Sequence, residues 1–132
     1  MSQTSKNLDV KSASILVVDD HANVSKLVEA YVSKAGLDHI EIDHAANIEI
    51  ALIRISQKRP NIVLLDNLLP PHFDFRYSVQ ELRAAYEGPL VLFSGEIPNN
   101  IGTHEIDNSL SATMSKDDIS TERFTALIKK YI

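Results

Sequence analysis

Five polar residues follow apolar runs of the sequence at the points where those runs stop. They are Asp19 and Asp20 after "ILVV", Asp66 after "IVLL", Ser94 after "VLF" and Lys116 in "TMSK". A lone buried carboxylate is costly unless something pairs with it. Three carboxylates close together call for a cation, and oxygen-only ligands suit a hard divalent ion, Mg²⁺ above all. Such a site keeps coordination positions for a phosphoryl group, to which a hydroxyl and an ammonium would donate.

The apolar runs are the predicted strands that must position these residues. Three runs are continuous, as in strands buried on both faces, whereas the segment 39–43 alternates, as in an edge strand, and 110–114 is weaker. The continuous runs are 15–18, 62–65 and 89–93. In the assumed strand order 2-1-3-4-5, the first and third strands are neighbours about 4.8 Å apart, so their terminal carboxylates converge.

Helical spacing of apolar residues separates the predicted strands. Helices are expected from Asn23, as the cap, to Gly36, over 47–57, from Phe75 to Tyr86, and after the cap Ser120. Residues 97–109 contain three asparagines, a glycine and a proline, which predicts a weak or irregular fourth helix. The expected fold is α/β: a doubly wound, five-stranded parallel sheet of flavodoxin-like order 2-1-3-4-5.

Length and composition limit the classes of function. The 132 residues suffice for one domain, expected over 14–132 after a disordered tail at 1–13, with no room for a second effector domain. The sequence has 13 basic and 18 acidic residues, and its basic residues form no stripe, which disfavours nucleic-acid binding. There is no cysteine, no run of membrane-spanning length and no signal-peptide core, so a soluble, cytoplasmic chain is expected.

The motifs "ILVVDD", "IVLLD", "VLFSG" and the lysine of "SATMSK" resemble the receiver domain of two-component response regulators, over residues 14–132. The resemblance implies signal transduction in a phosphorelay: Asp66 accepts a phosphoryl group from a phosphohistidine on a histidine kinase or histidine phosphotransfer protein. It further implies a set of roles around that residue. Asp20 holds Mg²⁺ directly and Asp19 through water, the backbone carbonyl of Leu68 is a further metal ligand, Ser94 rotates to bond one phosphoryl oxygen, and Lys116 neutralises another.

The sequence departs from the family pattern in three places. The loop "PPHFDF" has proline for one family glycine, Phe75 for another and an extra residue, His72, so it must run differently. Asp117 replaces the cis proline that follows the family's lysine, which predicts a trans bond. Thr113 stands where the family has its aromatic switch residue, so we expect the signal to leave through residues 97–109, predicted to be the most mobile segment.

Plainer interpretations compete with each assignment. A single Asp after a strand is more often a helix cap or a solvent contact, and Ser94 or Lys116 alone carries little information. His21 and His72 flank the predicted site, but surface imidazoles are favoured over metal ligands.

Three functions remain open at the level of the sequence. The first is a stand-alone receiver that is phosphorylated on Asp66 and acts through an unknown downstream protein, without being a turnover enzyme. The second is a receiver-like binding module that acts without phosphorylation. The third and weakest is a hydrolase that uses Asp66 as a turnover nucleophile, because no second general acid or base is evident.

Overall fold

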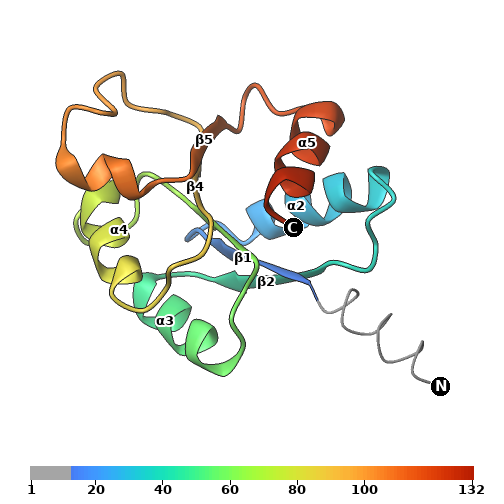
Figure 1. Ribbon diagram of the computed structural model, residues 1–132, viewed down its shortest axis with the longest axis horizontal. Coiled ribbons are helices and arrows are strands. Elements are labelled where there is room, and N and C mark those ends of the chain that lie inside the picture. The colour runs from blue at the N-terminus through green and yellow to red at the C-terminus, as the bar shows by residue number, and fades with distance from the viewer. Residues whose placement is uncertain (1–12) are drawn as a thin grey trace.

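Five parallel strands form one sheet in the computed structural model, which describes residues 13–132 (Figure 1). Their bounds are β1 Ser14–Val18, β2 Glu41–Ala45, β3 Ile62–Leu65, β4 Leu90–Ser94 and β5 Ala112–Ser115. The strand order is β2-β1-β3-β4-β5, which confirms the predicted topology. Every residue of β1, β3 and β4 is buried, because both faces of the central sheet are covered.

Helices cover the two faces of the sheet in pairs (Figure 1). The α-helices are α2 Asn23–Lys34, α3 Ile48–Gln57, α4 Phe75–Arg83 and α5 Thr121–Tyr131. The core on one face includes Val28 of α2 and Phe124 of α5, and the core on the other includes Ala51 of α3 and Leu82 of α4. The doubly wound α/β architecture expected from the alternating patterns is therefore present.

The helix starts confirm the predicted cap Ser120, correct the predicted cap Asn23 and reveal a further cap, Asn47, that was not predicted. The side chains of Asn47 and Ser120 accept hydrogen bonds from the backbone N–H groups of Ile50 and Arg123, as N-caps do. Asn23 is not a cap, because α2 already includes it and Ala22 precedes the helix without a side-chain cap. An asparagine in front of apolar residues at helical spacing therefore did not predict the start of α2 correctly.

Strand β2 begins two residues later than predicted. The segment 39–43 was expected, but pairing with β1 starts at Glu41 and ends at Ala45. Ile40 is buried, yet its N–H donates to the carbonyl of Leu37 in a turn, so it closes the turn instead of joining the strand. Glu41 to Ala45 alternate in exposure except for the buried last residue, as an edge strand should.

Between β4 and β5 the regular structure is a short 3₁₀ helix, η1, Glu105–Ser109, which agrees with the predicted weak fourth helix. The segment is nevertheless anchored by a partly buried ion pair, in which Arg76 Nε and Nη2 each lie 2.8 Å from a carboxylate oxygen of Asp107. The N–H groups of Gly102 and His104 also donate to Asp107. The bond from Arg76 lowers the pKa of Asp107 to about 2. The predicted mobility of residues 97–109 stays a prediction. The polar contacts of Asp107 hold this segment more firmly than its few apolar residues suggested.

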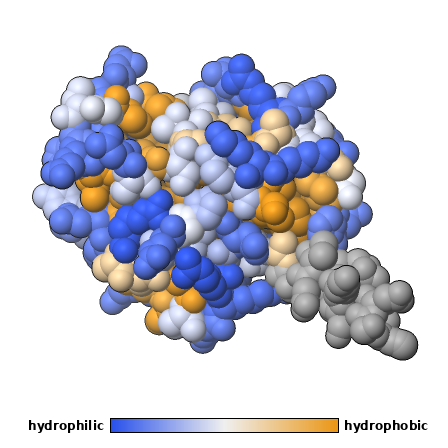
Figure 2. Space-filling view, viewed as in Figure 1, coloured by the Kyte–Doolittle hydropathy of each residue, from blue (hydrophilic) through white to orange (hydrophobic). Residues whose placement is uncertain are grey.

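The first described residue, Ala13, is buried, and its carbonyl accepts a hydrogen bond from Glu41 N–H. The predicted disordered tail otherwise lies outside the described residues. Within residues 13–132, no helix combines the length and the apolar character that crossing a membrane requires. Apolar residues reach the surface in separate patches among polar ones (Figure 2).

Candidate functional site

The predicted acidic residues meet at the carboxyl ends of β1 and β3. The register pairs Val18 with Leu65, so Asp19 and Asp66, the next residue on each strand, leave the sheet side by side. One side-chain ligand atom from each of Asp19, Asp20, His21 and Asp66 lies within 4.8 Å of the others. Asp19 and Asp66 are buried and Asp20 is exposed, so the cluster lines the bottom and rim of an open site.

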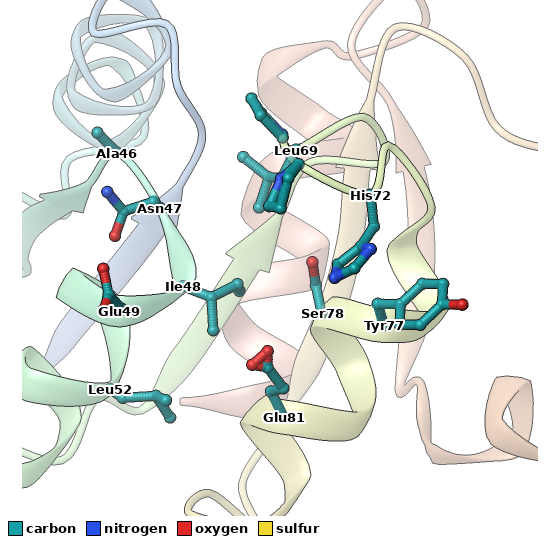
Figure 3. Close-up of a pocket in the computed structure, with 12 residues that line it drawn as sticks. Ala46, Asn47, Ile48, Glu49, Leu52, Leu69, His72, Tyr77, Ser78 and Glu81 are labelled. Carbon is teal, nitrogen blue, oxygen red and sulfur yellow. The ribbon is translucent and has the colours of Figure 1, made fainter.

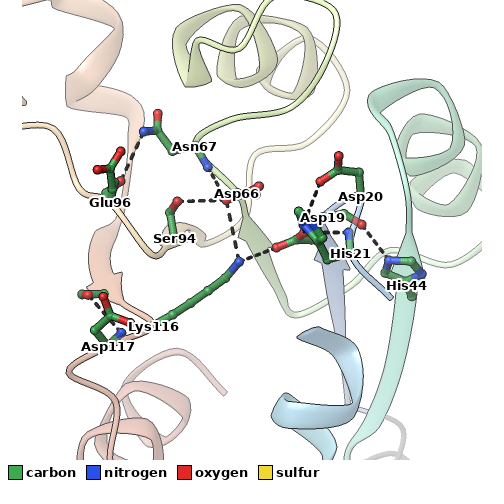
Figure 4. A network of polar contacts seen from close by, with 11 residues as sticks. Asp19, Asp20, His21, His44, Asp66, Asn67, Ser94, Glu96, Lys116 and Asp117 are labelled. Atoms are coloured by element: carbon green, nitrogen blue, oxygen red, sulfur yellow. Dashed lines mark hydrogen bonds and ion pairs between the residues drawn. The ribbon is translucent and has the colours of Figure 1, made fainter. Parts of the chain in front are cut away.

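Lys116 reaches this cluster from the end of β5, two strands away from β3 (Figure 4). Its Nζ lies 2.7 Å from Asp19 Oδ2 and 3.8 Å from Asp66 Oδ1. The backbone N–H of Lys116 donates to the Ser94 carbonyl, which fixes where the side chain starts. The cis peptide bond among the described residues is Pro70-Pro71, so the bond from Lys116 to Asp117 is trans, as predicted. The altered residue after Lys116 therefore does not keep its ammonium from the carboxylates.

Ser94 and Asn67 hold one oxygen of Asp66. The Ser94 hydroxyl and the Asn67 backbone N–H each donate to Asp66 Oδ1, both at 2.9 Å. Asn67 is itself held, because its side-chain amide donates to the carbonyl of Glu96. In residues 13–132, the hydrogen bonds to Asp66 all end on Oδ1. The carboxylate is thus oriented through Oδ1, while Oδ2 accepts no hydrogen bond from the described residues.

Two histidines adjoin the acidic cluster. His21 is exposed, as predicted for a surface imidazole, but its Nδ1 lies 3.1 Å from Asp20 Oδ1 and 3.3 Å from Asp19 Oδ1. His44 Nε2 lies 2.7 Å from the backbone carbonyl of Asp19 and must donate, because a carbonyl oxygen only accepts. Sequence analysis missed His44, because the predicted second strand stopped one residue before it.

His72 does not join the cluster. Its ring stacks on Tyr77, with centroids 4.2 Å apart (Figure 3). The loop does run differently from the family pattern, since its left-handed residue is Phe73, with φ of 55°. Asp74 then caps α4, and Phe75 is buried as the first helical residue. The assignment of the Leu68 carbonyl as a metal ligand remains a prediction.

The position of the family's aromatic switch carries no ring. Thr113 pairs with Leu92 in the sheet register and is exposed. Ser94, the other predicted switch residue, is buried and bonded to Asp66. A signal that starts at Ser94 therefore has no aromatic side chain to move at residue 113.

The chemistry of the donor set fits a hard divalent cation. Asp19, Asp20 and Asp66 supply carboxylate oxygens within one small volume, and such oxygens are the ligands that Mg²⁺ prefers. Lys116 supplies only part of the compensating charge, since one ammonium faces three carboxylates. The negative charge that remains on the carboxylates is consistent with a metal site that keeps water ligands and accepts a phosphate oxygen.

Comparison with known sequences finds partial relatives. No protein-family model matches the chain. A protein of Porphyra purpurea named "Probable transcriptional regulator ycf27" is 34% identical over 94 residues, which cover 70% of this chain and 37% of that protein. Its namesake in Porphyridium aerugineum is 36% identical over 80 residues, 61% of this chain and 32% of that protein. The chain thus spans about a third of the length of these curated relatives.

Solved structures give the class of fold. A two-component response regulator from Clostridium difficile has a TM-score of 0.75 at 18% identity, covering 91% of this chain and 95% of that one. The response regulator TrrA of Thermotoga maritima, solved with Mg²⁺ and BeF, has a TM-score of 0.72 at 22% identity, covering 91% and 99%. The receiver domain of RstA from Klebsiella pneumoniae, in its BeF₃-activated form, has a TM-score of 0.72 at 23% identity, covering 89% and 97%.

These likenesses, together with the strand order and the acidic cluster, define the class of the chain. It has the receiver-domain fold of two-component response regulators, as its sequence motifs predicted. The proteins it resembles here are named as response regulators or as a probable transcriptional regulator.

Proposed function

We propose that this chain is a response regulator receiver that accepts a phosphoryl group on Asp66 and acts in the cytoplasm through contacts with other proteins. The donor is a phosphohistidine on a histidine kinase or a histidine phosphotransfer protein. One observation carries the proposal: Asp66 is held through one oxygen by Ser94 and Asn67, beside Asp19, Asp20 and the ammonium of Lys116. This is the arrangement that in-line transfer to a carboxylate requires.

Mg²⁺ would be held by the carboxylates of Asp19, Asp20 and Asp66, with the backbone carbonyl of Leu68 as a further ligand. When bound, it supplies positive charge to the phosphoryl oxygens and relieves repulsion among the carboxylates. Asp19 would act through water, and its orientation is supported by Lys116, which bonds one of its oxygens, and by the backbone N–H of His21, which bonds the other.

The protein's own residues would carry the transfer as follows. The free oxygen of Asp66 attacks phosphorus, the bond from phosphorus to the donor's histidine nitrogen breaks, and that histidine leaves as a neutral imidazole after taking a proton from solvent. The product on this chain is an acyl phosphate. Lys116 would bind a phosphoryl oxygen, a role that its distance of 3.8 Å from Asp66 supports. Ser94 can turn its single O–H from Asp66 Oδ1 to another of these oxygens.

Incubation with a small phosphodonor such as acetyl phosphate, with Mg²⁺ or with a chelator, tests this function. Wild type should gain one acid- and base-labile phosphoryl mass, in a metal-dependent manner, and Asp66→Asn should gain none. Asp118→Asn, a change in an exposed turn at the same edge of the sheet, is the matched control and should behave as wild type. Equal labelling of Asp66→Asn and wild type would contradict the proposal.

A second candidate is a receiver-like module that binds its partner without phosphorylation. It is favoured by exposed Thr113, which cannot transmit a switch through an aromatic ring. The same experiment separates the candidates, because this module would gain no phosphoryl mass at all. Many rapid turnovers of the donor would instead support a hydrolase.

A further inference from the structure

A cavity of about 590 Å³ lies between α3 and α4, and none of its lining residues belongs to the acidic cluster (Figure 3). Ile48 and Leu52 of α3 form one side, and Tyr77 and Ser78 of α4 form the other. Buried Leu69, in the loop between Asp66 and α4, lines the cavity at its loop end. The volume lies within the range of about 300–1,000 Å³ that is typical of binding sites.

One wall of this groove is formed by the loop that follows Asp66. Pro70, Pro71 and His72 line it, and they lie in the stretch where the sequence departs from the receiver pattern. The stack of His72 on Tyr77 joins this loop to α4 and gives the wall a flat aromatic surface. The altered loop therefore forms one wall of the groove, and the acidic cluster is present despite the alteration.

The groove carries negative charge that the protein does not neutralise. Glu49 of α3 and Glu81 of α4 line it from opposite sides, and both are exposed. Within residues 13–132 neither carboxylate belongs to an ion pair, whereas the acidic residues of the neighbouring edge strand, Glu41 and Asp43, are paired with Lys58 and Arg54. Two carboxylates without an ion pair beside an apolar lining favour an occupant that is apolar at its tip and cationic at its flanks.

Apolar surface continues beyond the rim of the groove. Tyr77 is 52% exposed, Phe73 57% and Ile53, one helical turn after Glu49, 56%. Phe73 is held in the left-handed region, where a bulky residue is strained, and such strain concentrates at ligand clamps and other functional sites. An apolar rim around a cavity is the pattern of a protein docking site, because a small molecule would cover only the cavity itself.

We propose that the groove between α3 and α4 binds a short amphipathic helix of a partner protein, with an apolar side chain in the cavity and Lys or Arg beside Glu49 and Glu81. The apolar side chain contacts Ile48, Leu52 and Leu69, and the helix lies over Tyr77 and Phe73. The contact needs no phosphorylation. Since the loop that forms the wall begins at Asp66, a phosphoryl group there would change the affinity of the groove, a consequence that rests on the proposed function.

Two synthetic peptides of about 14 residues, with the same leucine pattern of an amphipathic helix and either Lys or Glu at the polar positions, are suitable probes. Titration of the full chain with each is followed by backbone amide spectra. The Lys peptide should bind and shift the signals of α3, α4 and residues 69–72, while the Glu peptide should not bind. Wild type and Asp66→Asn should bind equally, which separates this result from the fate of the phosphorylation proposal.

Charge reversal supplies the matched variants. The pair Glu49→Lys with Glu81→Lys should weaken binding of the Lys peptide about tenfold or more. The pair Glu29→Lys with Glu122→Lys makes the same change in net charge on exposed positions of α2 and α5 and should have little effect. Shifts confined to α2, α5 or the acidic cluster, equal weakening by both pairs, or no binding up to about 1 mM would overturn the proposal. Tighter binding of 2-phenylethylamine than of the peptide would overturn it in favour of a small-molecule site.

Discussion

The acidic cluster and the segment between β4 and β5 are held in place by different means. The cluster is positioned by the register of adjacent strands, so Asp19 and Asp66 meet whatever the loops do. The segment has little regular structure and is held by side-chain contacts, chief among them the partly buried ion pair between Arg76 and Asp107, 31 residues apart. Arg83 adds hydrogen bonds to the carbonyl of Ser109. The comparison shows that a site built on strand ends tolerates altered connections, whereas an irregular crossover depends on a few long-range side-chain contacts.

The largest effect on stability is expected from breaking the anchor of the crossover. Asp107→Ala leaves Arg76 unpaired and removes the acceptor for two backbone N–H groups, so the free energy of unfolding should fall by about 3 kcal/mol. Denaturant unfolding measures this change, with Asp118→Ala as an exposed control that should alter it little. Equal effects of the two substitutions would mean that the ion pair does not hold the segment.

Removing the ammonium of the acidic cluster should have a smaller and metal-dependent effect. Lys116→Met leaves buried Asp19 without its charged partner and should lower the free energy of unfolding by about 2 kcal/mol without metal. Mg²⁺ at millimolar concentration should raise the melting temperature of wild type, and of the variant by more, because the added cation replaces the lost charge. A melting temperature that Mg²⁺ leaves unchanged in both proteins would argue against a metal site.

The pH dependence of stability tests the ion pair of Asp107 with a substitution of nearly equal size, which leaves no cavity. Because the folded pKa of Asp107 is lowered to about 2, its stabilisation is complete above its unfolded pKa of about 3.9 and is lost as the pH falls toward 2. The difference in unfolding free energy between wild type and Asp107→Asn should therefore be constant from pH 7 to about 5 and shrink below about pH 4. A difference that grows on acidification would have the wrong sign.

The smallest predicted effects compare two helix starts. Asn47→Ala removes an observed cap of α3 and should cost about 1 kcal/mol of unfolding free energy, while Asn23→Ala should cost less than about 0.5. Both substitutions replace Asn by Ala near a helix start, so the change of residue type itself affects the two unfolding free energies alike. Equal losses would show that Asn23 contributes a cap after all.

Strand-end residues could be predicted from the sequence because local patterns determine them. An apolar run followed by Asp, Ser or Lys needs only the strand order to assemble Asp19, Asp66, Ser94 and Lys116. Contacts between distant polar residues have no such local pattern, so the pair of Arg76 with Asp107 and the bond from His44 were not foreseen. The start of β2 was wrong because apolar Ile40 is buried equally well in a turn. The groove between α3 and α4 depends on helix packing, which periodicity does not specify.

Locating the phosphoryl group within the chain tests the central claim most directly. After incubation with acetyl phosphate and Mg²⁺, borohydride reduction converts an aspartyl phosphate to homoserine, which peptide mass spectrometry assigns to one residue. Homoserine should occur at residue 66 and only when the metal is present. Homoserine at residue 19, 20 or 118 in place of 66, or modification that ignores the chelator, would contradict the account.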